Sequence, residues 1–185
     1  VVDRTFNCMS IDTDTSTSDT VVLMANGLAG SVRLAQFEKG LLQVCEYLTQ
    51  EIVRSGEGAT KLITVDVKGA KTTTQAKRVA KCVINSPLVK TAVYGCDPNW
   101  GRVIMAVGKS FDPSIDPAKV TIRFGATNVF KKGSPVDCDL EALRKYLGQP
   151  EVSIGVDLGI GKASVRVWGC DLTEGYIKEN AYYTT

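Results

Sequence analysis

The stretch Leu62-Ile-Thr-Val-Asp-Val67 alternates apolar with polar side chains, and a helical pattern follows it over residues 74–84. Alternation of this kind predicts a β-strand that buries one face. The helical pattern places four apolar residues on one side of the helix: Ala76, Val79, Ala80 and Val83. We therefore expect a strand and a helix whose apolar sides both face the core.

A longer helical pattern precedes this unit and ends at Ser55-Gly56, with Ser31 as its candidate N-cap. Its apolar residues repeat every 3.6 residues over about six turns and are expected to face the core. They are Leu34, Phe37, Leu41, Val44, Leu48 and Ile52. Before the helix, the polar turn Asp12-Thr-Asp-Thr-Ser-Thr-Ser-Asp19 is expected to lead into a buried strand over residues 20–24.

After Pro87 the chain shows shorter elements. We expect a strand over residues 89–94 and a helix over 103–107 that Asp97 caps, with Pro98 in its first turn. The remaining predictions are strands at 120–124 and 128–131, a helix from Asp139 to Gly148, and strands at 152–158 and 163–168 joined as a hairpin at 159–161. These elements predict an α+β fold in which helices layer a mixed sheet. The loop 112–117, with its two prolines, is expected to divide a main layered α/β domain, 1–111, from a smaller C-terminal α/β lobe, 118–185.

Composition excludes several classes of protein. Of 185 residues, 44% are hydrophobic, which is enough for a core, and 22 basic against 20 acidic residues give a net charge of only +2. No excess positive charge attracts nucleic acid, and no apolar run is long enough to cross a bilayer or to resemble a signal peptide. We expect a cytoplasmic protein with neither nucleic acid nor membrane as a partner.

The chain contains no histidine and six widely spaced cysteines. Nucleophiles that depend on a histidine base are therefore excluded, and the cysteines are expected to be free thiols. A base that fits such a protein is the α-amino group of an N-terminal Thr, as in enzymes where one Thr is both nucleophile and base. Val1 cannot be that residue.

Three local motifs have a functional and a structural interpretation. Glu57 lies between two glycines, where it could approach a ligand ammonium closely or simply be solvated beyond a helix end. Arg102 could clamp a carboxylate or pair with Asp97 to hold a turn. The acidic turn 12–19 lacks the central Gly and closing Glu of a calcium loop, so a hydrogen-bonded turn is the better interpretation.

Five segments follow one another along the chain: Asp12-Thr-Asp-Thr-Ser-Thr-Ser-Asp-Thr20, Gly56-Glu-Gly-Ala-Thr-Lys61, Asn85-Ser-Pro-Leu-Val-Lys-Thr-Ala92, Gly95-Cys-Asp-Pro-Asn-Trp-Gly-Arg102 and Asn180-Ala-Tyr-Tyr-Thr-Thr185. In order and spacing they resemble the β chain of the ornithine acetyltransferase family, also called glutamate N-acetyltransferases or arginine-biosynthesis bifunctional proteins. Thr13 and Ser18 stand where the family usually has Gly and Asn. The resemblance covers residues 6–185.

The resemblance implies a layered mixed β-sheet sandwich with helices outside, similar to DmpA and to N-terminal-nucleophile enzymes. A precursor would cut itself before a Thr, and that Thr would take acetyl from N2-acetylornithine and pass it to glutamate in arginine biosynthesis. No metal and no organic cofactor would be required. Acetyl-CoA would be an alternative donor only in bifunctional members.

By the same resemblance, Glu57, Asn180 and Thr185 are the expected substrate-binding residues, with the chain's tail returning to the active site. The sequence is expected to begin inside the β chain and to contain no catalytic residue. Its partners would be the α chain and the N-terminal segment of the same precursor, in a heterotetramer or larger assembly. Two alternatives stay open: an amide hydrolase or aminopeptidase on the same scaffold, and a non-catalytic fragment that binds amino acids.

Overall fold

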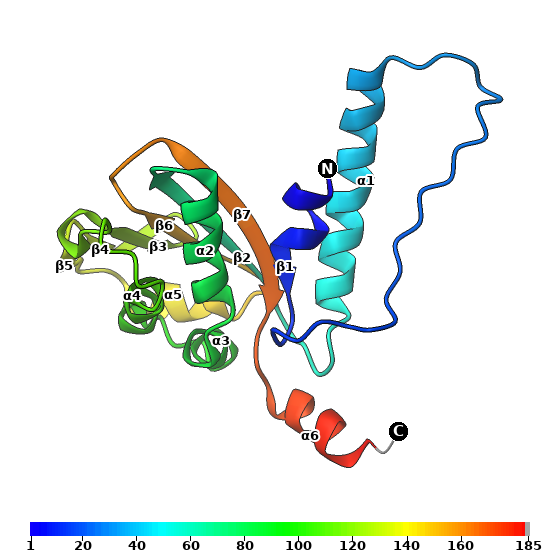
Figure 1. Ribbon diagram of the computed structural model, residues 1–185. Helices are drawn as coiled ribbons and strands as arrows, with labels where there is room; N and C mark the ends of the chain where they lie inside the picture. The colour runs from blue at the N-terminus through cyan, green and yellow to red at the C-terminus, as the bar shows by residue number, and fades with distance from the viewer. Residues whose placement is uncertain (184–185) are drawn as a thin grey trace.

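The computed structural model describes residues 1–183, which form one mixed seven-stranded sheet in the order β1-β7-β2-β6-β3-β4-β5 (Figure 1). The strands are β1 (Met9–Ser10), β2 (Leu62–Ala70), β3 (Thr121–Phe124), β4 (Thr127–Lys131), β5 (Ser134–Pro135), β6 (Glu151–Asp157) and β7 (Ala163–Cys170). The helices are α1 (Leu34–Arg54), α2 (Thr73–Ile84), α3 (Pro87–Tyr94), α4 (Trp100–Gly108), α5 (Leu140–Leu147) and α6 (Glu174–Tyr182). Short 3₁₀ turns are η1 (Val2–Arg4), η2 (Phe6–Cys8) and η3 (Pro117–Lys119). The predicted α+β class with a mixed sheet is confirmed.

Strand β2 lies in the interior of the sheet, third in this order, and it is the strand predicted from residues 62–67. It pairs in parallel with β6 and antiparallel with β7. Ile63, Val65 and Val67 are fully buried on one face, and α2 packs against both β2 and β7. The predicted inward face of α2 is also confirmed, because its four apolar residues are all inaccessible to solvent.

The predicted hairpin between β6 and β7 is wrong, because β2 lies between the two strands. The connection crosses the end of β2, where the Leu158 and Ile160 amides donate to the carbonyls of Lys68 (2.9 Å) and Gly69 (2.8 Å). Gly161 is packed against β2 so closely that a Cβ would lie 2.1 Å from the Ala70 carbonyl oxygen. The sequence predicted a hairpin because the connection is short. Strands β6 and β7 instead each pair with β2 and not with each other.

Two predictions near Pro87 are corrected. Residues 89–94 belong to helix α3, not to a strand, because Pro87 is its first residue and the Ser86 side chain caps it by accepting from the Val89 amide. Helix α4 is longer than predicted, and its cap is Asn99 instead of Asp97. The Asp97 carboxylate accepts a hydrogen bond from the Asn99 amide at 3.0 Å.

The elements after residue 111 follow their predictions more closely. Both strands β3 and β4 form, and Asp139 and Gly148 bound α5 as expected. The loop 112–117 is present, but strands from both sides of it join the same sheet. The boundary is therefore not a break in the sheet, and the division into 1–111 and 118–185 stays a prediction.

Helix α1 forms, but its predicted core face is wrong. The residues it buries are Cys45, Thr49 and Val53, whereas the apolar stripe at Phe37 and Val44 is exposed. Arg33 is the N-cap, so Ser31 is not.

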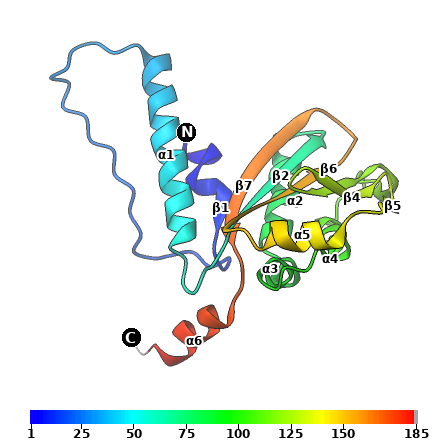
Figure 2. The ribbon, with the colours of Figure 1, turned by 180° about the vertical axis from the view of Figure 1, so that it is seen from behind.

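Residues 20–24 form no strand, and Figures 1 and 2 show the segment between β1 and α1 extending away from the sheet. Among residues 1–183, no helix is long and apolar enough to span a membrane.

The crossing of the 158–162 connection over β2 generates a stability prediction. Gly161→Ala should lower the free energy of unfolding by about 1–3 kcal/mol, because the new methyl group overlaps a backbone carbonyl that cannot move aside. Thermal and urea denaturation measure the loss. Gly108→Ala is the matched control, since a Cβ there meets nothing within 4 Å. Equal stability of the two variants would contradict the described crossing.

Candidate active site

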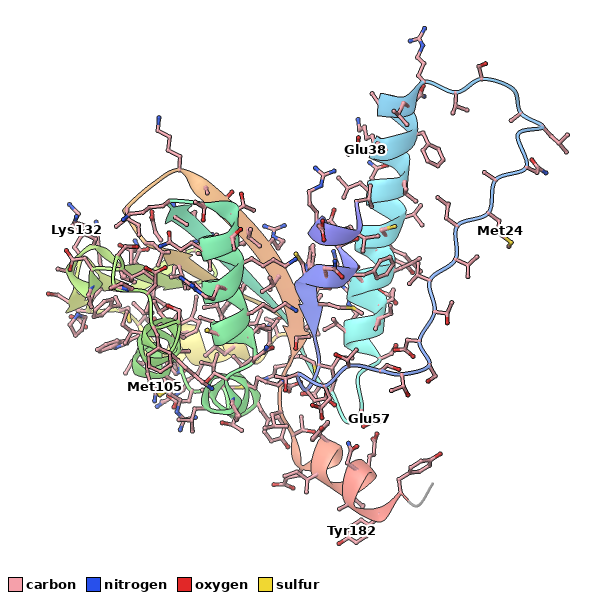
Figure 3. All side chains as sticks on the ribbon, viewed as in Figure 1. Met24, Glu38, Glu57, Met105, Lys132 and Tyr182 are labelled. Atoms are coloured by element: carbon pink, nitrogen blue, oxygen red, sulfur yellow. The ribbon has the colours of Figure 1, made fainter. Side chains whose placement is uncertain are left out.

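Glu57 and Asn180 meet at the same end of the molecule. Glu57 lies in the loop between α1 and β2, and Asn180 lies on α6. The Asn180 amide nitrogen donates to the Glu57 carboxylate at 2.6 Å, although the two residues are 123 positions apart. Both side chains are exposed, and Figure 3 shows Glu57 beside α6. This contact places α6 against the loop that carries Glu57.

The contacts of Asn180 fix the orientation of its amide group. Its nitrogen also donates to the Tyr176 carbonyl at 3.0 Å, so both neighbours are hydrogen-bond acceptors. The NH₂ group must face them, which leaves the amide oxygen for a ligand. Glu57 and Asn180 thus both present acceptor oxygens, and a ligand ammonium is the group they can bind together.

Buried polar groups hold the Glu57 loop against the end of β7. The Asp171 carboxylate, on a residue only 3% exposed, accepts from the backbone amides of Thr60 (2.9 Å) and Lys61 (3.0 Å) and from the Thr60 hydroxyl. The Thr173 hydroxyl donates to the Gly58 carbonyl at 2.6 Å. Leu62 lies opposite Cys170 in the sheet. The segment before Leu62 and the segment after Cys170 therefore leave the sheet at the same place.

The loop and α6 are in direct backbone contact at two glycines. Gly58 has φ of +61°, a conformation that favours glycine. A Cβ on Gly58 would lie 2.2 Å from the Tyr176 amide nitrogen and 2.4 Å from the Gly175 carbonyl carbon. Any side chain at residue 58 would therefore push α6 away from the loop that carries Glu57.

The acidic turn reaches the same site through Tyr176. The Tyr176 hydroxyl donates to the Asp12 carboxylate at 3.2 Å. Partial burial and then the charge of Asp12 raise the pKa of the Tyr176 phenol, with smaller contributions from Asp14 and Glu57. Within the turn, the Asp14 amide donates to Asp12 at 3.0 Å, which agrees with the predicted hydrogen-bonded turn. Three carboxylates, those of Asp12, Asp14 and Glu57, therefore lie near the Tyr176 hydroxyl.

Lys90 anchors the base of the acidic turn. Its residue is 5% exposed, and its ammonium group donates to the Ile11 carbonyl, next to Asp12. Burial lowers the pKa of Lys90, while the neighbouring Cys170 and Asp171 favour its charged form. The Cys170 sulfur lies 3.8 Å from the Lys90 nitrogen. The bond to Ile11 and the contact with Cys170 account for a buried lysine on α3, whose other buried residues are apolar.

The structure brings together only some of the residues that the sequence singled out. Glu57 and Asn180 are in contact, whereas Thr185 lies outside the described residues. Arg102 does not pair with Asp97; its guanidinium donates to the Leu88 carbonyl at 2.9 Å. All six cysteines are free, as predicted, and residues 1–183 contain no group of side chains that could hold a metal ion.

Sequence reasoning missed the supporting residues Asp171, Thr173 and Tyr176. Thr173 precedes Glu174 and a helical segment, so its role as the N-cap of α6 had a sequence signal. Its second bond, to Gly58, had none, because the partners are 115 residues apart.

A protein-family model described as the ArgJ family matches residues 1–185, and the chain therefore belongs to that family. Glutamate N-acetyltransferase Oat2 of Streptomyces clavuligerus is 56% identical over 190 residues, which cover 100% of this chain and 48% of that protein. Arginine biosynthesis bifunctional protein ArgJ 2 of a Nostoc species is 53% identical, with 100% and 48% covered. The resemblance seen in the five motifs is thereby confirmed.

The fold is also that of a solved relative. The crystal structure of an arginine biosynthesis bifunctional protein from Bacillus halodurans superposes with a TM-score of 0.94 at 43% identity, covering 98% of this chain and 89% of the solved chain. This chain spans about half the length of the curated relatives it matches. The solved chain, in contrast, has nearly the extent of this one.

The contact between the two glycines predicts how the site can be opened. Gly58→Ala should displace α6, so that amides of residues 174–183 exchange with solvent at least about tenfold faster. Hydrogen exchange followed by mass spectrometry measures the change. Gly95→Ala is the control, because Gly95 has φ of −77° and its Cβ would meet only the Thr91 carbonyl, at 3.4 Å. Unchanged exchange in Gly58→Ala would refute the close contact.

Proposed function

We propose that this chain is the substrate-binding part of an enzyme that transfers acetyl from N2-acetylornithine to glutamate in cytoplasmic arginine biosynthesis. The observation that carries the proposal is the 2.6 Å contact between Glu57 and Asn180, two residues that the family resemblance assigns to the substrate. The names of the relatives, glutamate N-acetyltransferase and arginine biosynthesis bifunctional protein, support the same reaction.

The charges of the site fit this substrate class. Ornithine, its acetyl derivative and glutamate each carry an ammonium or amino group, and the site presents Glu57, the Asn180 amide oxygen and the nearby carboxylates of Asp12 and Asp14. A carboxylate paired with an ammonium forms a charge-assisted hydrogen bond, which is stronger than a neutral one. The proposed role of this chain is to hold the free δ-ammonium group of N2-acetylornithine, the amino group that takes no part in the transfer.

The proposed reaction has two acyl-transfer steps. A Thr hydroxyl on a partner chain attacks the acetyl carbonyl of N2-acetylornithine, its proton passes to the departing nitrogen, and the amide C–N bond breaks to release ornithine. The α-amine of glutamate then attacks the acetyl-threonine ester and frees the Thr. An oxyanion hole stabilises each tetrahedral intermediate. The proposal includes no metal or organic cofactor, and acetyl-CoA is a donor only if the enzyme is bifunctional.

A partner chain is part of the proposal because α1 leaves an apolar stripe uncovered. Val44 is 56% exposed and Leu34 76% exposed, and Val21, Val22 and Leu23, in the segment before α1, are each more than 60% exposed. Exposed apolar surface of this extent marks an interaction site. We infer that the other half of the precursor, the α chain with the N-terminal segment, covers it after autocatalytic cleavage in a heterotetramer or larger assembly.

Glu57→Gln, in the protein purified with its partner chain, should raise the KM for N2-acetylornithine about 10- to 100-fold, because a charged hydrogen bond is worth about 1.5–3 kcal/mol. The kcat should change much less, since the glutamine keeps the shape of the site. Acetylglutamate formation measures both constants. Glu141→Gln, an exposed residue in the first turn of α5, is the charge-matched control.

The same assay, combined with intact mass spectrometry of the separated chains, distinguishes the alternative functions. Product that requires glutamate, together with one acetyl group gained by a co-purifying chain that begins with Thr, supports transfer. Acetate released at the same rate without glutamate would instead indicate an amide hydrolase. Binding of ornithine with no acetylated chain and no product would indicate a fragment that only binds amino acids.

The uncovered stripe predicts the partner contact. Val44→Asp should abolish co-purification of the partner chain, because a carboxylate buried in an apolar interface costs several kcal/mol. Size-exclusion chromatography and gel analysis of the tagged protein measure it. Lys39→Asp is the control, since Lys39 lies on the opposite side of α1 from the stripe. Normal assembly of Val44→Asp would refute the assignment of this face.

A further inference from the structure

Helix α6 is not positioned by apolar packing. None of its residues is buried, and its Ile177, Tyr182 and neighbouring Tyr183 are all more than 60% exposed. A helix of nine residues is also too short to be stable on its own in water. Its place against the Glu57 loop therefore depends on the few polar contacts that connect it to the rest of the chain.

Three such contacts exist among the described residues, and they differ in burial. The bonds from Asn180 to Glu57 and from Tyr176 to Asp12 are exposed to solvent, where water competes for both partners. Thr173, by contrast, is 4% exposed, and its hydroxyl bonds the Gly58 carbonyl at 2.6 Å. The contact made by Thr173 is the least exposed of the three, so water competes least with it.

The Thr173 hydroxyl makes two bonds at once. It donates to the Gly58 carbonyl, and it accepts from the Tyr176 amide at 3.2 Å as the N-cap of α6. One oxygen thus joins the loop that carries Glu57 to the first turn of the helix that carries Asn180. A hydroxyl has one proton to donate and lone pairs to accept, so a single Thr or Ser can make both bonds.

We propose that Thr173 is a positioning residue for the substrate site, holding Asn180 and Glu57 in register through its bonds to Gly58 and Tyr176. This inference rests on the proposed function, because it concerns the residues proposed to bind the substrate. Thr173 itself does not touch the reacting atoms. Its neighbour Asp171 fixes the other end of the same loop at Thr60 and Lys61, which leaves the Glu57 segment held on both sides.

The test compares Thr173→Val with Thr173→Ser in the protein assembled with its partner chain. Val keeps the shape and removes the hydroxyl, and the KM for N2-acetylornithine should rise about tenfold with less than about threefold change in kcat. Ser keeps the hydroxyl and should restore the KM to within about twofold. Exchange of the amides in residues 174–183 should accelerate about tenfold in the Val variant only. Thr173→Ala removes the same hydroxyl without β-branching and should match Val.

Thr72→Val is the matched control for lost stability. Thr72 caps α2 by the same kind of bond, to the Gln75 amide, but lies beyond the opposite end of β2. Its variant should lose a helix cap and keep the KM. An equal rise in KM for Thr72→Val, an unchanged KM in Thr173→Val, or no recovery in Thr173→Ser would each overturn the inference. If the wild-type protein transfers no acetyl group, the proposed function fails, while the exchange data still decide whether Thr173 holds α6.

Discussion

The hydrogen bonding of β2 to a strand on each side is the constraint on which the rest of the structure depends. Leu62 pairs with Glu151 on one side and with Cys170 on the other. The segment that enters β2 and the segment that leaves β7 therefore lie at the same end of the sheet. Asp171 and Thr173 meet residues 58–61 there, and the Glu57 loop and α6 come together as a consequence.

Sequence patterns predicted what depends on neighbours along the chain. The strand at 62–67, the inward face of α2 and both ends of α5 were correct because alternation, helical spacing and capping are local effects. The hairpin at 159–161 was wrong because strand pairing is decided across the sheet. The core face of α1 was wrong for another reason: a stripe of apolar residues shows that something covers it, but not whether the cover belongs to the same chain.

The candidate site was predictable only in part. Glu57 and Asn180 came from the family resemblance, and neither would stand out from its own surroundings, since one follows a helix end and the other lies near the chain's end. Their contact, and the parts played by Asp171, Thr173 and Tyr176, depend on pairs of residues more than 100 positions apart. Such pairs are set by the order of strands in the sheet, which local pattern does not encode.

The position of β2 between two later strands also has a consequence for biosynthesis. Residues 62–70 emerge from the ribosome long before residues 151–170, so β2 has neither of its partner strands until those later residues have been made. Folding that waits for distant contacts is slow, and an unpaired apolar strand is prone to aggregate in the meantime. The seven-stranded sheet and the contact between Glu57 and Asn180 are then completed in one event, since the segment that leaves β7 also carries Thr173. A nascent chain that is stalled before residue 171 would have neither.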